Sequence, residues 1–133
     1  MKVIRVTCAI IQQSNQILVT QRSAQMSLPC KWEFPGGKIE VGEDEETCIL
    51  REIKEELGID IKLLGKLPSN THDYGNIIIE LIPFRAKYLG GSIDLKEHMD
   101  YAWLTFDELG NLDWAPADIP IVESVIQHKS GRS

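Results

Sequence analysis

Short runs of apolar and β-branched residues, separated by turn residues, cover most of this chain, and this pattern is typical of β-strands. The runs predict strands at residues 3–11, 16–21, 32–34, 59–67, 76–88 and 101–104. The polar sequence Gln-Gln-Ser-Asn between the first two runs supplies turn residues and predicts a hairpin. Turns are also expected at residues 72–75 and 90–91, and the Pro-Gly-Gly sequence after residue 34 is expected to end the third strand.

Residues 44–57 have the spacing of an amphipathic helix instead. Its apolar stripe is expected to consist of Ile49, Ile53, Leu57 and Leu50. Asp44 is placed to cap the N-terminus, and Gly58 is placed to end the helix. A short helix near residues 107–109 and a final helix over 119–129 complete the pattern. A mixed sheet between helices, and therefore the α/β class, is the natural packing of these elements.

Composition and charge are those of an ordinary soluble domain. The chain has 133 residues, of which 43% are hydrophobic and 26% charged, with no repeats or linker, so residues 1–133 are expected to form a single domain. The net charge of −6 and the pI near 5.0 argue against binding to nucleic-acid backbones. An acidic protein can still bind a small anionic ligand, because bound metal ions supply positive charge locally.

The cysteines and the N-terminal sequence indicate in which cellular compartment the protein is expected. Cys8, Cys30 and Cys48 are odd in number and scattered, which predicts free, mostly buried thiols and neither a disulfide framework nor a zinc site. The first apolar run is short and broken by Arg5, so it predicts a strand rather than a signal peptide. No apolar segment is long enough to span a membrane. We expect a cytoplasmic protein with no membrane partner.

The helix over residues 44–57 carries a cluster of acids. Glu52, Glu55 and Glu56 lie at i, i+3 and i+4, so at about 100° per residue they share one side of the helix. Like charges at this spacing destabilise a helix unless positive charge lies among them. Mg²⁺ and Mn²⁺ prefer carboxylate oxygens, and their sites usually also hold substrate phosphates. The alternative is a solvated acidic face, which leaves the bracketing Gly37 and Gly58 unexplained.

From Gly37 to Ile59 the sequence resembles the Nudix box, G-x5-E-x7-R-E-U-x-E-E-x-G-U with U apolar, and every defined position is filled. The resemblance implies a Nudix-type α/β/α sandwich and a hydrolase that depends on Mg²⁺, with Mn²⁺ able to replace it. The metal ligands that it implies are Gly37, Glu52, Glu55, Glu56 and the distant Glu97. It also implies that Arg51 and Glu43 orient the catalytic glutamates, and that Glu52 or Glu97 is the base. Alternatively, Arg51 only pairs with Glu55, and Glu97 is an ordinary loop residue.

The segments that flank the box, residues 32–38 and 115–120, are similar to the MutT-type branch, above all to bacterial CTP pyrophosphohydrolases that also act on damaged deoxynucleotides. This resemblance implies hydrolysis of a nucleoside triphosphate to the monophosphate and pyrophosphate. Alternatives are a MutT-like 8-oxo-dGTP diphosphatase, a hydrolase of a nucleoside diphosphate derivative such as ADP-ribose, and a catalytically inactive nucleotide-binding module. The expected partner is a small-molecule nucleoside triphosphate, and the chain is expected to be a monomer or homodimer.

Four residues outside the box are candidates for substrate binding. Phe34 could stack on a base or belong to the core, and Arg22 and Lys38 could neutralise phosphates or be ordinary surface cations. Asp118 lies where MutT-type relatives read the base, but it could instead cap the last helix. An ionised Asp118 only accepts hydrogen bonds, which favours a cytosine-type or hydroxylated adenine base. The O6 of 8-oxoguanine needs a donor, so Asp118 would read it only if burial kept the carboxyl protonated.

Overall fold

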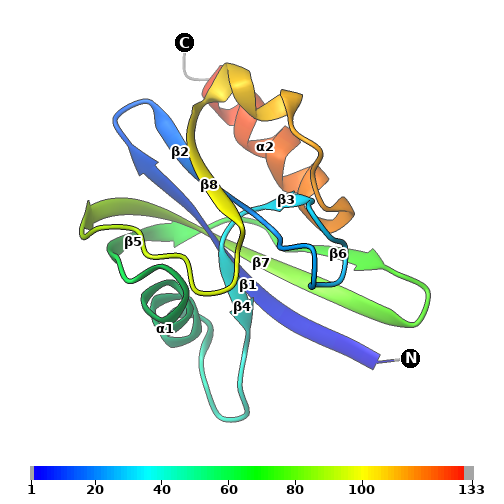
Figure 1. Cartoon of the computed structure of the whole chain (residues 1–133). Coiled ribbons are helices and arrows are strands. Elements are labelled where there is room, and N and C mark those ends of the chain that lie inside the picture. Colours follow the sequence, from blue (N-terminus) through cyan, green and yellow to red (C-terminus); the bar gives the residue numbers. More distant parts are fainter. Residues whose placement is uncertain (1, 131–133) are drawn as a thin grey trace.

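The computed structural model describes residues 2–130 of the chain, and it places a mixed sheet between helices (Figure 1). The strands are β1 (Lys2–Gln13), β2 (Gln16–Gln21), β3 (Trp32–Glu33), β4 (Gly36–Lys38), β5 (Asp60–Lys66), β6 (Asn70–Asp73), β7 (Ile77–Gly90) and β8 (Asp100–Thr105). The helices are α1 (Glu45–Leu57), α2 (Ile119–Ser130) and the 3₁₀ helices η1 (Phe106–Asn111) and η2 (Pro116–Asp118).

Strand β1 lies at the centre of the sheet. It runs parallel to β7 from the pair Lys2–Ile77 to the pair Gln12–Lys87, and β5 and β6 then pair with β7 in the antiparallel direction. At its other edge β1 forms the predicted hairpin with β2, and β2 in turn pairs with β3 and β8. Both parallel and antiparallel pairs occur, so the predicted mixed sheet is confirmed.

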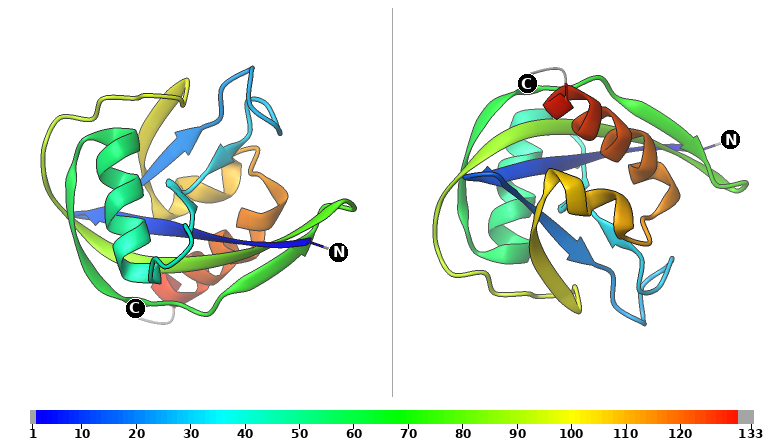
Figure 2. Two further views of the ribbon diagram at one scale, coloured as in Figure 1. Left: turned by 90° about the horizontal axis from the view of Figure 1, so that it is seen from below. Right: turned by 90° about the horizontal axis from the view of Figure 1, so that it is seen from above.

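Two hydrophobic clusters lie on opposite faces of the sheet, because successive side chains of a strand point to opposite sides. Ala9 and Ile11 of β1 belong to the cluster that also contains Ile53 of α1. Cys8 and Ile10 belong to the other cluster, which contains residues of η1, η2 and α2. Figure 2 shows α1 on one side of the sheet and α2 with η1 on the other.

Both predicted ends of helix α1 are confirmed. The Asp44 side chain accepts a hydrogen bond from the Thr47 backbone N–H at 2.7 Å, and Gly58 ends the helix with a φ of 73°. The predicted apolar stripe is wrong at one position, because Leu50 is 44% exposed while Cys48 is buried. At about 100° per residue, Leu50 and Cys48 lie on opposite edges of the buried arc. That arc is displaced toward Cys48, so the helix buries part of its acidic side.

Two short strands were not predicted. The Pro-Gly-Gly sequence was expected to end a strand, but Gly36 and Gly37 form β4 on β1. Glycine is required there, because a Cβ at position 36 would lie 2.0 Å from the Thr7 carbonyl oxygen. β6 occupies part of the predicted turn at residues 72–75, and the chain reverses just after it.

The predicted free and mostly buried thiols are confirmed. Cys8 and Cys48 are buried, whereas Cys30 is exposed. Cys30 lies in the loop between β2 and β3 with a φ of 65°, so a turn rather than core packing sets its position. No helix of residues 2–130 is long and apolar enough to cross a membrane.

Candidate active site

A cleft of about 550 Å³ lies where β1, β3, β4, α1 and η2 meet. It brings together most of the site residues predicted from the sequence, although they are far apart along the chain. Those that line it are Arg22, Phe34, Gly37, Lys38, Glu52, Glu56, Glu97 and Asp118. A second cavity, of about 370 Å³, lies on the α2 side of the sheet, and the described residues around it include no acid. The 550 Å³ cleft is therefore the candidate active site.

Glu52 and Glu56 of α1 supply the half-buried carboxylates of the cleft. Burial raises the pKa of both groups, and the negative charge of Glu97 raises the pKa of Glu56 further. Glu52 can reach its position only because residue 37 is glycine, since a Cβ there would lie 2.2 Å from the Glu52 carboxyl carbon. Strand β4 and helix α1 are thus so close at this point that the Glu52 carboxylate fits between them only if residue 37 has no side chain.

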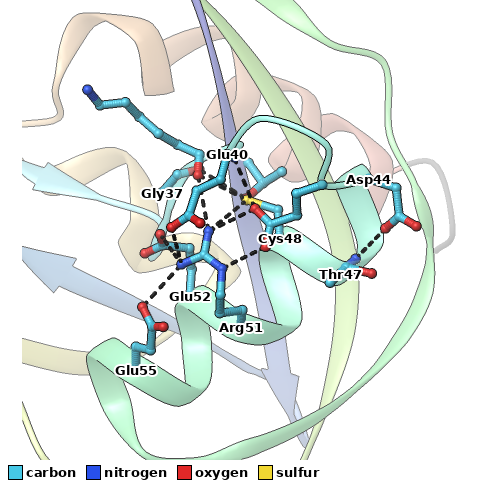
Figure 3. A network of polar contacts seen from close by, with 11 residues as sticks. Gly37, Glu40, Asp44, Thr47, Cys48, Arg51, Glu52 and Glu55 are labelled. Atoms are coloured by element: carbon cyan, nitrogen blue, oxygen red, sulfur yellow. Dashed lines mark hydrogen bonds and ion pairs between the residues drawn. The ribbon is translucent and has the colours of Figure 1, made fainter.

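Arg51 occupies the centre of a carboxylate network beside the cleft (Figure 3). Its guanidinium donates to both oxygens of Glu43, at 2.6 and 2.9 Å, to Glu52 at 2.9 Å and to Glu55 at 3.1 Å. It also donates to the Lys38 carbonyl oxygen at 3.3 Å. The hydrogen bonds from Arg51 lower the pKa of Glu43 to about 2. The Arg51–Glu55 pair is real but is one contact of several, so this geometry fits an orienting role for Arg51 and Glu43.

The residues of the cleft fit a hard divalent cation in their chemistry. The Glu56 Oε2 atom is buried and has no hydrogen-bond partner among the described residues. A buried carboxylate oxygen without a partner is costly unless a cation or donor binds it. Glu52, Glu56, Glu97 and the carbonyl of Gly37 could hold the ion, and such oxygen ligands suit Mg²⁺ and Mn²⁺. No three His, Cys, Asp or Glu side chains of the described residues form a preassembled metal site, so the carboxylates would have to close on the ion.

Glu55 and Glu97 stand apart from the two buried acids. Glu55 has 58% of its side chain exposed, and it is bonded to Arg51 rather than lining the cleft. Glu97 is exposed in the loop between β7 and β8, yet it borders the cleft and acts electrostatically on Glu56. The prediction that Glu97 belongs to the same site as Glu52 and Glu56 is therefore supported by its place at the cleft. Its role as a ligand stays a prediction.

Phe34 and Asp118 meet at the other end of the cleft. The Phe34 ring is 2% exposed and packs on Trp114 with centroids 4.9 Å apart, so it belongs to the core. Stacking on a base would use only the small part of the ring that borders the cleft, and it stays a prediction. The backbone N–H of Phe34 donates to Asp118 Oδ2 at 3.0 Å. The Asp118 side chain therefore accepts its described hydrogen bond from the segment between β3 and β4, and not from a backbone N–H of α2. This argues against the alternative that Asp118 caps the last helix.

The environment of Asp118 changes its expected chemistry. Asp118 is 5% exposed, and burial and the nearby charge of Glu33 raise its pKa well above the usual range. A protonated carboxyl can donate a hydrogen bond as well as accept one. The raised pKa extends the pH range in which Asp118 is protonated, so a donor role toward the base stands as a prediction beside the acceptor role.

The two predicted cations differ in their availability. Arg22 donates to Glu33 at 2.9 Å and to the backbone oxygen and hydroxyl of Ser27 at 2.6 and 3.0 Å. Lys38 is exposed at the rim of the cleft, and its ammonium makes no ion pair with a described residue. Lys38 is therefore the cation that is free to meet a phosphate.

Sequence reasoning missed the interaction between Glu33 and His98, which both line the cleft. Their side chains meet at 2.8 Å, although 65 positions separate them along the chain. Glu33 lies inside the MutT-like segment, and His98 directly follows Glu97, so their sequence neighbours were the only signal.

Comparison with known proteins identifies the class to which this fold and site belong. The NUDIX domain family matches residues 1–125. A CTP pyrophosphohydrolase of Escherichia coli (strain K12) is 34% identical over 132 residues, which cover 99% of this chain and 98% of that protein. The 8-oxo-dGTP diphosphatase of the same strain is 31% identical over 123 residues, which cover 92% of this chain and 95% of that protein.

A solved structure agrees with this assignment. The solution structure of the E. coli ORF135 protein matches with a TM-score of 0.87 and 34% identity, over 99% of this chain and 94% of that one. The chain belongs to the NUDIX domain family. It is a Nudix hydrolase of the MutT type, and the predicted α/β Nudix fold is confirmed.

Proposed function

We propose that this Nudix hydrolase is a divalent-metal-dependent nucleoside triphosphate pyrophosphohydrolase that releases a monophosphate and pyrophosphate. The observation that carries the proposal is that Glu52, Glu56 and Glu97 line one cleft. Arg51 donates a hydrogen bond to the Glu52 carboxylate. The relatives named for nucleoside triphosphate substrates match over nearly the whole chain, which supports a nucleotide as the substrate.

Different groups of the cleft would have different roles in this hydrolysis. A bound Mg²⁺ or Mn²⁺ would neutralise phosphate charge and orient the attacking water. Arg51 donates a hydrogen bond to the Glu52 carboxylate and so helps to orient it, and burial raises the pKa of Glu52, which makes this candidate general base more basic. The free ammonium of Lys38 at the rim is available for a phosphate oxygen. Glu97 remains the alternative base, since it borders the same cleft.

For the base, we propose that the enzyme acts on CTP-like, dCTP-like or oxidised nucleotides and that Asp118 reads the base. Its buried position at the end of the cleft supports this, and the names of the two relatives include both a cytosine and an oxidised guanine nucleotide. The raised pKa of Asp118 supports 8-oxo-dGTP as a second candidate substrate, because a protonated carboxyl can donate a hydrogen bond to O6 of the base. This weakens the preference for cytosine expected from an ionised carboxylate.

A substrate panel tests the proposal. The purified protein with Mg²⁺ is offered CTP, dCTP, 2-hydroxy-dATP, 8-oxo-dGTP and ADP-ribose, and pyrophosphate and phosphate release are measured separately. We expect pyrophosphate release from at least one triphosphate, and we expect chelation to abolish it and Glu56→Gln to reduce it by about 10²-fold or more. Phosphate release, turnover of ADP-ribose alone, or no turnover of any compound would each contradict the proposed reaction.

A further inference from the structure

The loop of residues 91–99 crosses one side of the cleft and carries Glu97 and His98. Its backbone is fixed at both ends. Asp94 N–H donates to the Leu57 carbonyl at 2.9 Å, and Lys96 N–H donates to the Glu56 carbonyl at 3.3 Å, which ties the loop to the end of α1. Met99 N–H donates to the Gln21 carbonyl at 3.0 Å, which ties it to β2. Glu97 and His98 therefore bridge the gap between a helix and a strand.

The two neighbouring side chains point to different surroundings. Glu97 is exposed, whereas His98 is only 8% exposed. The His98 Nε2 atom lies 2.8 Å from Glu33 Oε2, and the other oxygen of Glu33 accepts from Arg22 at 2.9 Å. Since a carboxylate oxygen accepts, the imidazole donates through Nε2. The middle of the loop is thus bound to β3 by a single buried side chain.

Two observations separate His98 from an ordinary core residue. Among the side chains that the structure describes, only Glu56 Oε2 and His98 Nδ1 are buried polar atoms without a hydrogen-bond partner, and both residues line the cleft. Glu56 also interacts electrostatically with both His98 and Glu97. An apolar ring would fill the same space without the cost of burying a nitrogen that has no partner. The polar ring is explained if its contact with Glu33 serves the site.

We propose that His98 is a positioning residue that, through its bond to Glu33, holds Glu97 beside Glu56 so that both carboxylates reach the same divalent cation. This inference rests on the proposed metal-dependent function. Without the bond, the loop keeps its backbone hydrogen bonds at Asp94, Lys96 and Met99, but the described contacts include no other side-chain hydrogen bond from residues 97–98. The exposed Glu97 carboxylate would then have to be ordered by the cation itself, which lowers the affinity for the metal.

Amide substitutions test the two ring nitrogens separately. The amide nitrogen of His98→Gln can occupy the place of Nε2 and keep the bond to Glu33, whereas the shorter His98→Asn reaches only the place of Nδ1. Mn²⁺ binding to the protein without substrate is measured by electron paramagnetic resonance, together with the melting temperature and the Mg²⁺ concentration that gives half-maximal rate. We expect His98→Asn to weaken Mn²⁺ binding by about 10- to 100-fold, the usual loss when a supporting partner of a metal ligand is removed. His98→Gln should restore most of it.

A double mutant shows whether the effect passes through Glu33. Glu33→Gln alone should weaken Mn²⁺ binding, and adding His98→Asn to it should cause little further loss. A lowered melting temperature with unchanged Mn²⁺ affinity in His98→Asn, or strictly additive effects with Glu33→Gln, would overturn the positioning role.

Glu56→Gln is the control for the proposed metal-dependent function on which the role of His98 rests. If Glu56→Gln binds Mn²⁺ as tightly as the parent protein, the proposed metal site itself fails, whereas loss of binding in Glu56→Gln with full binding in His98→Asn rejects only the role of His98.

Discussion

A Cβ atom at residue 37 would lie 2.2 Å from the carboxyl carbon of Glu52, so Gly37 and Glu52 cannot both be kept in place if residue 37 carries a side chain. The atom that must give way is the end of a flexible side chain, not backbone. Displacing it costs little stability but moves a carboxylate that the proposed reaction needs. The glycine of the box is in this view part of the site rather than a turn residue.

Gly37→Ala is therefore expected to lower kcat/KM by about 10- to 100-fold, the usual scale for disturbing a supported metal ligand, while the melting temperature changes little. Gly110→Ala is the matched control, because a Cβ at Gly110 meets no atom within 4 Å. Steady-state kinetics and thermal unfolding of both variants check this. Equal activity of the two variants would show that Glu52 need not occupy its observed position.

Glu55 and Glu56 should contribute unequally. Glu56→Gln is expected to reduce kcat by about 10²-fold or more, since a preorganised group that stabilises charge is usually worth about 10²–10³. Glu55→Gln should also reduce kcat, but by less, because Glu55 is 58% exposed and bonded to Arg51 outside the cleft. Burial raises the pKa of Glu56, so its ionised form destabilises the folded protein, and Glu56→Gln should be at least as stable at pH 7. Folded variants with near-full turnover would reject the site.

The Arg51–Glu43 pair predicts a specific acid sensitivity. The pKa of Glu43 is lowered to about 2 in the folded protein, against about 4.3 for an unperturbed glutamate. Its contribution to stability is therefore present above the unfolded value and is lost as the pH falls toward the folded value. The melting temperature of Glu43→Gln should lie below that of the parent protein at pH 7, and the difference should shrink below about pH 4. A difference that is independent of pH would mean that Glu43 acts through packing alone.

The position of water attack can be read from isotope labelling. By the resemblance to MutT-type enzymes, water is expected to attack the β-phosphorus of the triphosphate. Hydrolysis in ¹⁸O-labelled water should then place the label in pyrophosphate and leave the nucleoside monophosphate unlabelled, as mass spectrometry of both products would show. Label in the monophosphate would assign the attack to the α-phosphorus instead.

Contacts within one helix or its caps were predictable from the sequence, and contacts between distant elements were not. The spacing of Glu52 and Glu56 on α1 and the cap at Asp44 follow from helix geometry alone. The Glu33–His98 bond joins β3 to a loop 65 positions away, and no periodicity brings those residues together. Leu50 was misplaced for a related reason, because the face that a helix buries is decided by the sheet beneath it and not by its apolar residues alone.

Asp118 makes the last prediction, which concerns the choice of base. In the folded protein its pKa is raised well above the usual range by burial and by Glu33. Below this pKa the carboxyl is protonated and can donate to the O6 of 8-oxoguanine, and above it the carboxylate can only accept, as the amine of cytosine requires. The ratio of kcat/KM for CTP to that for 8-oxo-dGTP should therefore rise with pH. Measuring both values across the pH range in which the protein stays folded tests this.

Two variants decide whether Asp118 is responsible for that trend. An amide both donates and accepts at every pH, so Asp118→Asn should keep the bond from Phe34 N–H, make the ratio independent of pH and shift it toward 8-oxo-dGTP at high pH. Asp118→Ala should cost about 1–3 kcal/mol in kcat/KM for the better substrate, the value of one base contact. It should also lower the melting temperature, because the Phe34 N–H loses its partner. If Asp118→Ala lowers only the melting temperature and Asp118→Asn keeps the pH trend, Asp118 has a structural role and another group reads the base.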